Sequence, residues 1–286
     1  MAVIEEEIET RKLLTPYINR LDTFLKMESG YPFADEDEIM DPISTFLCNS
    51  PFFGQKYANK LFHDLGHIVC YPINAQIIEG IPPRDFLETC AKGRKRIMQS
   101  VLTEFKTIFS LVDLSDIVNE NMDIFNMWNK AKWSGSHPIN IISTLQTGEH
   151  IVSTEENALF RIILNAINNS EKAVTRKFKE TKIEGQIKLY CRTETGKIVL
   201  DVYDNGIGFN SLLREIDYSP SGYEIPLSVL IEHSKGISGF TKMHLGGTGQ
   251  GLGIMEHQAK LLGIEMFIVN PNMVDGSCIS MKFGQH

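Results

Sequence analysis

The chain has 286 residues, enough for one large or two modest domains, and an ordinary apolar content of 42%. Its net charge of −8 argues against a dedicated nucleic-acid-binding protein, because no broad basic surface can neutralise phosphates. The five cysteines are scattered and lack zinc-ligand spacing, so we interpret them as reduced thiols of a cytoplasmic protein. We expect neither a membrane span nor a signal peptide, since no long apolar stretch is present.

Residues 1–50 form an acidic, mixed segment to which we assign no function. A helix is expected around residues 8–24, and Pro16 should interrupt or kink it. Residues 28–42 are rich in Asp, Glu, Pro and Gly and are expected to form a loop.

Residues 51–112 are predicted to form a helical hairpin, with helices at 55–80 and 85–112 and a turn at Gly80-Ile-Pro-Pro83. A lone hairpin buries its apolar stripes poorly, so we expect two chains to pair into a dimeric four-helix bundle. The stripes are Tyr57, Leu61, Leu65 and Ile68 on the first helix, and Ile97, Val101, Phe105, Ile108 and Val112 on the second.

Residues 113–286 change to an α+β pattern, predicted to form one α/β-sandwich domain. Ser115 or Asp116 can cap its first helix. The other predicted elements are a helix at 155–174 with Leu159, Ile162, Ile163, Ala166 and Ile167 inward, a β-hairpin around Thr195-Gly196, a helix at 251–262 stopped by Gly263, and strands at 264–269 and 278–283.

Three polar or glycine-rich segments in this domain have complementary chemistry, although each alone is more often a plain turn or helix face. They are Asn165-Ala-Ile-Asn-Asn-Ser-Glu-Lys172, Asp204-Asn-Gly-Ile-Gly208, and Gly246-Gly-Thr-Gly-Gln-Gly-Leu-Gly253.

Each segment suits a different part of a nucleotide. Asn165 and Asn169 share a helix face, where an amide oxygen can ligate Mg²⁺. Asp204 ends an apolar strand, where its carboxylate needs a partner such as an adenine amino group. The glycine-rich 246–253 loop opens a helix, whose free N–H groups can hold phosphates. It lacks the Lys-Ser or Lys-Thr of the Walker phosphate loop.

In order and spacing these segments resemble the N, G1 and G2 boxes of the ATPase superfamily that includes gyrase, mismatch-repair proteins and histidine kinases. The resemblance covers residues 113–283 and implies that Asn165 holds Mg²⁺, that Asp204 binds adenine and that residues 210–245 form a mobile lid over ATP. The ATP-binding residues it implies are Asn165, Asn169, Lys172, Asp204, Gly206, Gly208, Gly247, Thr248, Gly249, Gly251 and Leu252.

Arg161 lies four residues before Asn165, where the ATP-hydrolysing branch of the superfamily has a Glu that activates water. Without that base, the γ-phosphoryl group should be kept for another acceptor. Histidine kinases often have a polar amide at this position and a Lys where this sequence has Asn168, so the N box departs from their pattern twice.

His63-Asp64 resembles the H box of histidine kinases, in which a His followed by an acidic residue lies on the first hairpin helix. On a helix, His63 falls about 200° from the apolar stripe, on the solvent side. The resemblance therefore implies that His63 is the phospho-acceptor, with Asp64 orienting its ring or accepting its proton. Histidine kinases commonly have a Pro five residues after the acceptor His, and this sequence has Ile68 at that position. His67, four residues after His63, gives a metal-binding alternative.

The sequence thus predicts an α+β protein: a helical hairpin at 51–112 followed by an ATP-binding domain at 113–286. It is expected to be a cytoplasmic, homodimeric histidine kinase that uses ATP and Mg²⁺ and passes phosphate to the receiver domain of a response regulator. The rivals are a histidine phosphotransferase that has lost ATP chemistry, a serine kinase like the mitochondrial dehydrogenase kinases, and a plain ATPase.

Overall fold

The computed structural model describes residues 2–26, 36–55, 57–59, 61–62, 64–65, 84–132, 139–208, 224–236, 250–269 and 276–284. The chain divides into two compact units, Met1–Ile108 with Asp123–Lys132, and Phe109–Met122 with 133–286. The described cysteines Cys48, Cys90, Cys191 and Cys278 are free thiols. Among the helices described, none has the length and apolar character needed to cross a membrane.

The first unit is helical and starts earlier than expected. Helix α1 spans Ala2–Lys26 and continues through Pro16, which faces solvent, so its missing hydrogen bond leaves no buried carbonyl. Helix α2 spans Glu36–Asn49, so the predicted loop at 28–42 is wrong from residue 36 onward. Acidic residues at its start favour a helix N-terminus, and Met40, Ile43 and Leu47 make its buried face.

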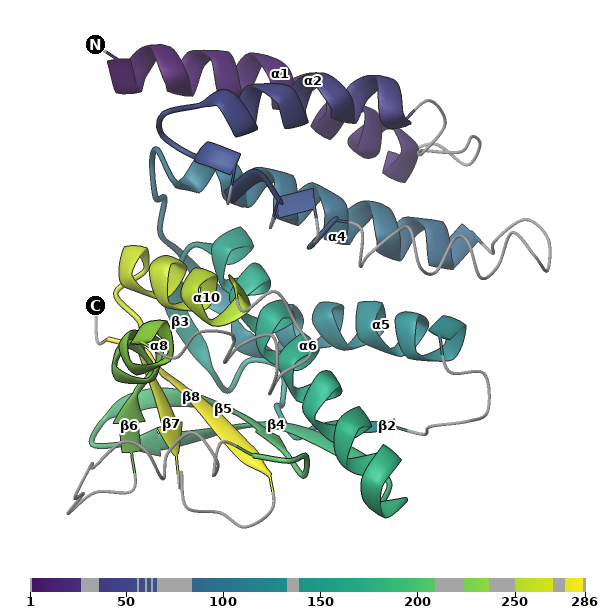
Figure 1. Cartoon of the computed structure of the whole chain (residues 1–286), viewed down its shortest axis with the longest axis vertical. Coiled ribbons are helices and arrows are strands. Elements are labelled where there is room, and N and C mark those ends of the chain that lie inside the picture. Colours follow the sequence, from purple (N-terminus) through teal and green to yellow (C-terminus); the bar gives the residue numbers. More distant parts are fainter. Residues whose placement is uncertain are drawn as a thin grey trace. The chain divides into compact units, whose positions relative to one another are not determined.

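Helix α4 (Arg84–Thr103) packs against α1, which runs antiparallel to it (Figure 1). Arg84 donates to the Phe24 carbonyl at 2.7 Å, and Lys95 pairs with Asp22 at 2.5 Å.

The stripes predicted on the hairpin are buried within one chain only in part. Leu61, Leu65, Ile97 and Val101 are at most 1% exposed. The described residues from 54 to 65 outside positions 56, 60 and 63 are helical, whereas 66–83 lie outside the described part of the chain.

The second predicted hairpin helix was extended too far. Helix α4 ends at Thr103, Ile108 is 64% exposed, and Val112 lies in strand β1 (Ser110–Asp113). The β-branched and aromatic run Thr107-Ile-Phe favours extended backbone, which explains the early end. Strand β1 pairs antiparallel with β3 (Ile151–Thr154). Helix α5 spans Leu114–Lys132. Asp113, rather than Ser115 or Asp116, caps it, because the Asp113 carboxylate accepts the backbone N–H of Ser115.

The second unit is built on a six-stranded sheet of order β2-β4-β5-β8-β7-β6, in which only β2 pairs in parallel. Helices α6 (Glu156–Thr181), α8 (Leu227–Gly236) and α10 (Gln250–Leu261) cover one face of this sheet (Figure 1). The strands are β2 (Ile139–Ser143), β4 (Gly185–Glu194), β5 (Lys197–Asp204), β6 (Glu224–Pro226), β7 (Glu265–Val269) and β8 (Ser277–Lys282).

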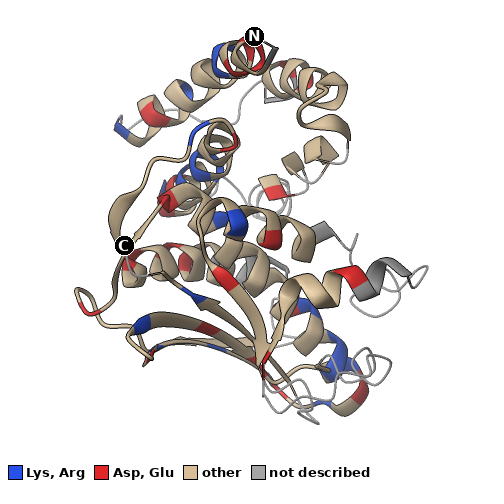
Figure 2. Ribbon diagram, turned by 90° about the vertical axis from the view of Figure 1, so that its left-hand side faces the viewer, with Lys and Arg blue, Asp and Glu red and all other residues tan. Residues whose placement is uncertain are grey.

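Local sequence signals in this unit are confirmed. All five residues predicted to face inward on α6 are fully buried. Thr195 and Gly196 both have positive φ, as a two-residue hairpin turn requires, and Gly263 ends α10 with φ +66°. Basic and acidic residues are interspersed over the strands and helices (Figure 2).

Candidate nucleotide-binding site

Helix α6 carries the first of the three predicted segments and packs against strands β4 and β5 of the sheet. Its N-terminus is capped by Glu155, whose carboxylate accepts the backbone N–H groups of Asn157 at 3.2 Å and Ala158 at 2.7 Å. Burial raises the pKa of Glu155, although these hydrogen bonds oppose the shift. The fixed helix start and its buried apolar face set the rotation of α6, so that Asn169, Ser170 and Ala173 turn towards the end of β5.

Asp204 ends strand β5 as a carboxylate that is only 2% exposed. One oxygen accepts the Gly206 backbone N–H at 2.9 Å, and the other accepts the hydroxyls of Ser170 at 3.0 Å and Ser277 at 2.6 Å. Burial raises the pKa of Asp204, and the hydrogen bonds from Ser277, Gly206 and Ser170 oppose this rise. The side chain is therefore held in place at the base of a pocket.

The glycines after Asp204 are required by close backbone approach. A Cβ on Gly206 would lie 2.6 Å from the Ala173 carbonyl carbon. Gly208 has φ +66°, and a Cβ there would lie 2.5 Å from the Gly276 carbonyl oxygen. Asn205 fixes the same turn, because its side chain accepts from Gln186 N–H at 2.7 Å and donates to the Glu184 carbonyl at 2.9 Å.

The two Asn residues of the first segment differ in their surroundings. Asn165 is 2% exposed, and its amide donates to the Arg161 carbonyl at 2.9 Å. Asn169 is half-buried, and its amide nitrogen has no hydrogen-bond partner among the described residues. A Cβ on Gly251 would lie 3.4 Å from the Asn169 side-chain oxygen, so α10 begins directly beside this amide.

These elements enclose one pocket beside Asp204. It is lined by Asn169, Ser170, Ala173, Asp204, Gly208, Leu252, Ser277 and Ile279. The structure thus brings together residues of all three predicted segments, from α6, the end of β5 and the start of α10. An aromatic base with an amino group fits a floor that offers a carboxylate and two hydroxyls.

Other predicted site residues lie elsewhere or outside the described residues. Lys172 is half-buried on α6. Asp64 is fully buried in the helical unit. His63, His67, Gly247, Thr248 and Gly249 are not among the described residues. Within the described part, no group of three His, Cys, Asp or Glu side chains is arranged to hold a metal ion.

The sequence analysis missed Ser170 and Ser277 as partners of Asp204. Both adjoin quoted motif residues, Asn169 and Gly276, but hydroxyls are too common for their position alone to indicate a contact. The predicted lid was also too long, because residues 224–236 form β6 and α8, in which Ile225, Leu227 and Leu230 are at most 2% exposed. The remainder of that segment lies outside the described residues.

The chain is similar to a known protein family and to solved structures. The sequence model of the family described as "Histidine kinase-, DNA gyrase B-, and HSP90-like ATPase" matches residues 154–285. No curated protein matches the chain. Similar solved structures include the Acinetobacter baumannii histidine kinase AdeS, with 13% identity over 78% of this chain and 97% of that chain and a TM-score of 0.41. The ATP-binding domain of PrrB from Mycobacterium tuberculosis gives 16% identity, 62% and 98% coverage, and a TM-score of 0.37.

A sheet covered on one face by three helices, with a pocket lined from α6, α10 and the end of β5, defines an α/β-sandwich domain. Together with the family match, it shows that residues 154–285 form a histidine kinase-, DNA gyrase B- and HSP90-like ATPase domain, a type that binds ATP. A helical unit precedes this domain in the chain.

Proposed function

We propose that the chain is an ATP-dependent protein histidine kinase that phosphorylates its own His63 and passes the phosphoryl group to an aspartate of a separate receiver domain. The observation that carries the proposal is the convergence of Asn169, Asp204, Gly208 and Leu252 on one pocket, from three separate sequence segments. The carboxylate of Asp204 accepts the adenine amino group, and the glycine-rich start of α10 lies on the phosphate side.

The transfer needs a nucleophile other than water. An imidazole nitrogen of His63 attacks the γ-phosphorus, the bond from that phosphorus to the bridging oxygen breaks, and ADP leaves with the oxygen. The imidazole proton goes to a base or to solvent. Complete burial of Asp64 favours a positioning function for its carboxylate over proton exchange with solvent. Phosphohistidine then donates the phosphoryl group to a receiver carboxylate: the N–P bond breaks as the carboxylate oxygen bonds to phosphorus, and the ring nitrogen takes up a proton, which restores the neutral imidazole.

Mg²⁺ suits this pocket, because an amide oxygen beside phosphates is a ligand that it accepts. The pocket favours Asn169 over Asn165 as the residue that holds it, since Asn169 lines the pocket whereas Asn165 is 2% exposed and does not line it. When bound, the ion offsets charge on the phosphates. With Asn169 in this position, the residue four earlier is an amide, Asn165, and the residue three later is Lys172, which removes both departures from the histidine kinase pattern.

A pair of variants separates the two asparagines. Asn169→Ala should abolish the gain in ATP affinity that Mg²⁺ gives in calorimetric titration. Asn165→Ala should keep that gain and lose thermal stability, because a buried hydrogen bond is removed. If Asn165→Ala loses the Mg²⁺-dependent gain in affinity and Asn169→Ala keeps it, Asn165 is the residue that holds Mg²⁺.

The homodimer is proposed on the family resemblance alone. The sequence predicted a dimer because a lone hairpin would leave its apolar stripes exposed. Four stripe residues are instead buried within one chain and need no second chain to cover them: Leu61, Leu65, Ile97 and Val101. Light scattering at micromolar concentration tests it directly, and a monomeric mass would refute it.

Labelled ATP tests the kinase activity, with His67→Ala as the matched control. The wild type and His67→Ala should incorporate phosphate that is lost in acid and kept in base, whereas His63→Ala should incorporate none. Incorporation by His63→Ala, with a product that survives acid, would exclude the histidine kinase and favour the serine-kinase rival.

A further inference from the structure

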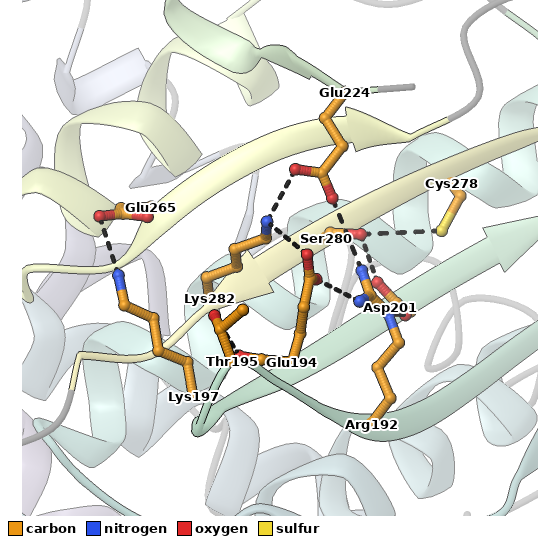
Figure 3. A network of polar contacts seen from close by, with 10 residues as sticks. All are labelled: Arg192, Glu194, Thr195, Lys197, Asp201, Glu224, Glu265, Cys278, Ser280 and Lys282. Atoms are coloured by element: carbon orange, nitrogen blue, oxygen red, sulfur yellow. Dashed lines mark hydrogen bonds and ion pairs between the residues drawn. The ribbon is translucent and has the colours of Figure 1, made fainter. Parts of the chain in front are cut away.

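The face of the sheet opposite the helices carries a cluster of charged side chains from β4, β5, β6 and β8 (Figure 3). Its innermost member is Asp201, which is 2% exposed and pairs with Arg192 at 2.7 Å and with the hydroxyl of Ser280. The cluster comprises Arg192, Glu194, Asp201, Glu224, Ser280 and Lys282. A carboxylate this deeply buried needs such partners.

Lys282, like Arg192, is a cation shared by several carboxylates of the cluster. Its ammonium lies 2.7 Å from Glu224 and 3.4 Å from Glu194, and it also lies over the Phe267 ring at 4.7 Å. Burial alone would lower the pKa of Lys282, but the two carboxylates outweigh it and hold the pKa above its ordinary value. Lys282 is only 13% exposed, so the pair with Glu224 is less screened than a surface ion pair.

Glu224 is the only member of the cluster on β6, and it reaches past β7 to Lys282 on β8. Among the described residues, strand β6 covers Glu224–Pro226, ends the strand order of the sheet and pairs with β7. One of the three is Pro226, which has no N–H to donate. The Glu224 ion pairs therefore add a connection from β6 to β4 and β8 beyond its ladder with β7.

The position of β6 is connected to the pocket through two helices. Helix α8 starts at Leu227, immediately after β6, and packs against α10. Helix α10 carries Leu252, which lines the pocket, and Gly251, which adjoins Asn169. A shift of β6 would therefore move α8 and, through it, the start of α10.

We propose that Glu224 is a positioning residue for nucleotide binding: by tying β6 to Lys282 and Arg192 across the sheet, it holds α8 and α10 where the pocket needs them. The proposal rests on the proposed function, because it concerns the ATP pocket. Glu224 lies on the opposite face of the sheet from that pocket and touches no nucleotide.

The test compares Glu224→Gln with Glu265→Gln. Glu265 lies on the same outer face and also pairs with a lysine, Lys197 at 3.3 Å, but it stands on β7 and outside the cluster. Well below the melting temperature, Glu224→Gln should raise the calorimetric Kd for ATP by roughly three- to tenfold, a range usual for coupling between distant sites. Glu265→Gln should leave the Kd within experimental error, and Glu224→Asp, which keeps the charge, should recover part of the affinity.

Hydrogen exchange gives a second readout, since the Ile225 amide on β6 should exchange faster in Glu224→Gln than in Glu265→Gln. If Glu224→Gln lowers the melting temperature yet binds ATP like Glu265→Gln, Glu224 is merely structural and the inference fails. If the wild type itself does not bind ATP, the proposed function fails instead.

Discussion

Replacing Asp204 with Asn tests the adenine site most directly, because the described residues give the carboxylate a defined set of hydrogen bonds. Its two oxygens accept three protein hydrogen bonds, from Gly206, Ser170 and Ser277. In Asp204→Asn one oxygen can still accept from Gly206, and the two hydroxyls can rotate to accept from the new NH₂ group. The empty protein should therefore fold, and removing a buried charge whose pKa is raised should not lower its stability at neutral pH.

Nucleotide binding should respond in the opposite way. The adenine amino group would meet an amide donor in place of an acceptor, which costs about 2–4 kcal/mol for an unsatisfied buried pair. At about 1.4 kcal/mol per tenfold, the Kd for ATP should rise roughly 30- to 1000-fold. Calorimetry measures the affinity and a thermal melt checks the fold. A well-folded Asp204→Asn protein with unchanged ATP affinity would refute the assignment of Asp204 to adenine.

Three further outcomes follow from the same contacts. Gly206→Ala should cost about 1–3 kcal/mol of stability and weaken ATP binding, because the added Cβ would clash with the Ala173 backbone. Gly253→Ala is the control, since its Cβ would have no atom within 4 Å, and it should change neither the thermal melt nor the calorimetric affinity. Leu61→Ala should cost about 2–5 kcal/mol in denaturant unfolding and leave ATP affinity intact, and a weakened affinity would contradict the separation of pocket and helical unit. Because the pKa of Asp204 is raised, its carboxylate should take up a proton at a higher pH than an ordinary Asp, and ADP binding should weaken as the pH falls through that range. Asp204→Asn should lack this pH-dependent loss. If the wild type and Asp204→Asn show the same dependence of ADP affinity on pH, the prediction is wrong.

The parts of the fold that the sequence predicted best are those specified by local chemistry. Helix α6 was predicted from five apolar residues at helical spacing, all of which are fully buried. The β4–β5 hairpin was predicted from Thr195-Gly196, and the end of α10 from Gly263. In each case a few neighbouring residues determine the backbone, so no distant contact is needed to make the assignment.

The errors fall where tertiary contacts decide. Residues 36–42 were assigned to a loop by composition, yet Met40 belongs to a buried helix face. Val112 continues the apolar spacing of α4, but pairing with Val152 on β3 places it in a strand. Similarly, the resemblance implied a lid over residues 210–245, although Ile225 pairs with Ile268 and is buried. Spacing and composition carry no information about such partners.

The N box shows most clearly what geometry adds to a motif. Asn165 and Asn169 are one helical turn apart, so both satisfy a pattern that asks for an Asn on this face. One turn of α6 is about 5.4 Å, which decides whether an amide lies at a nucleotide or behind it. The contacts distinguish them: Asn169 lines the pocket, whereas Asn165 does not and donates its amide N–H to the Arg161 carbonyl. If Asn169 is the metal-holding residue, the position used by a water-activating Glu in the hydrolysing branch is taken by Asn165. An amide cannot accept a proton from water at neutral pH, so the reasoning that reserves the γ-phosphoryl group for a protein acceptor holds without Arg161.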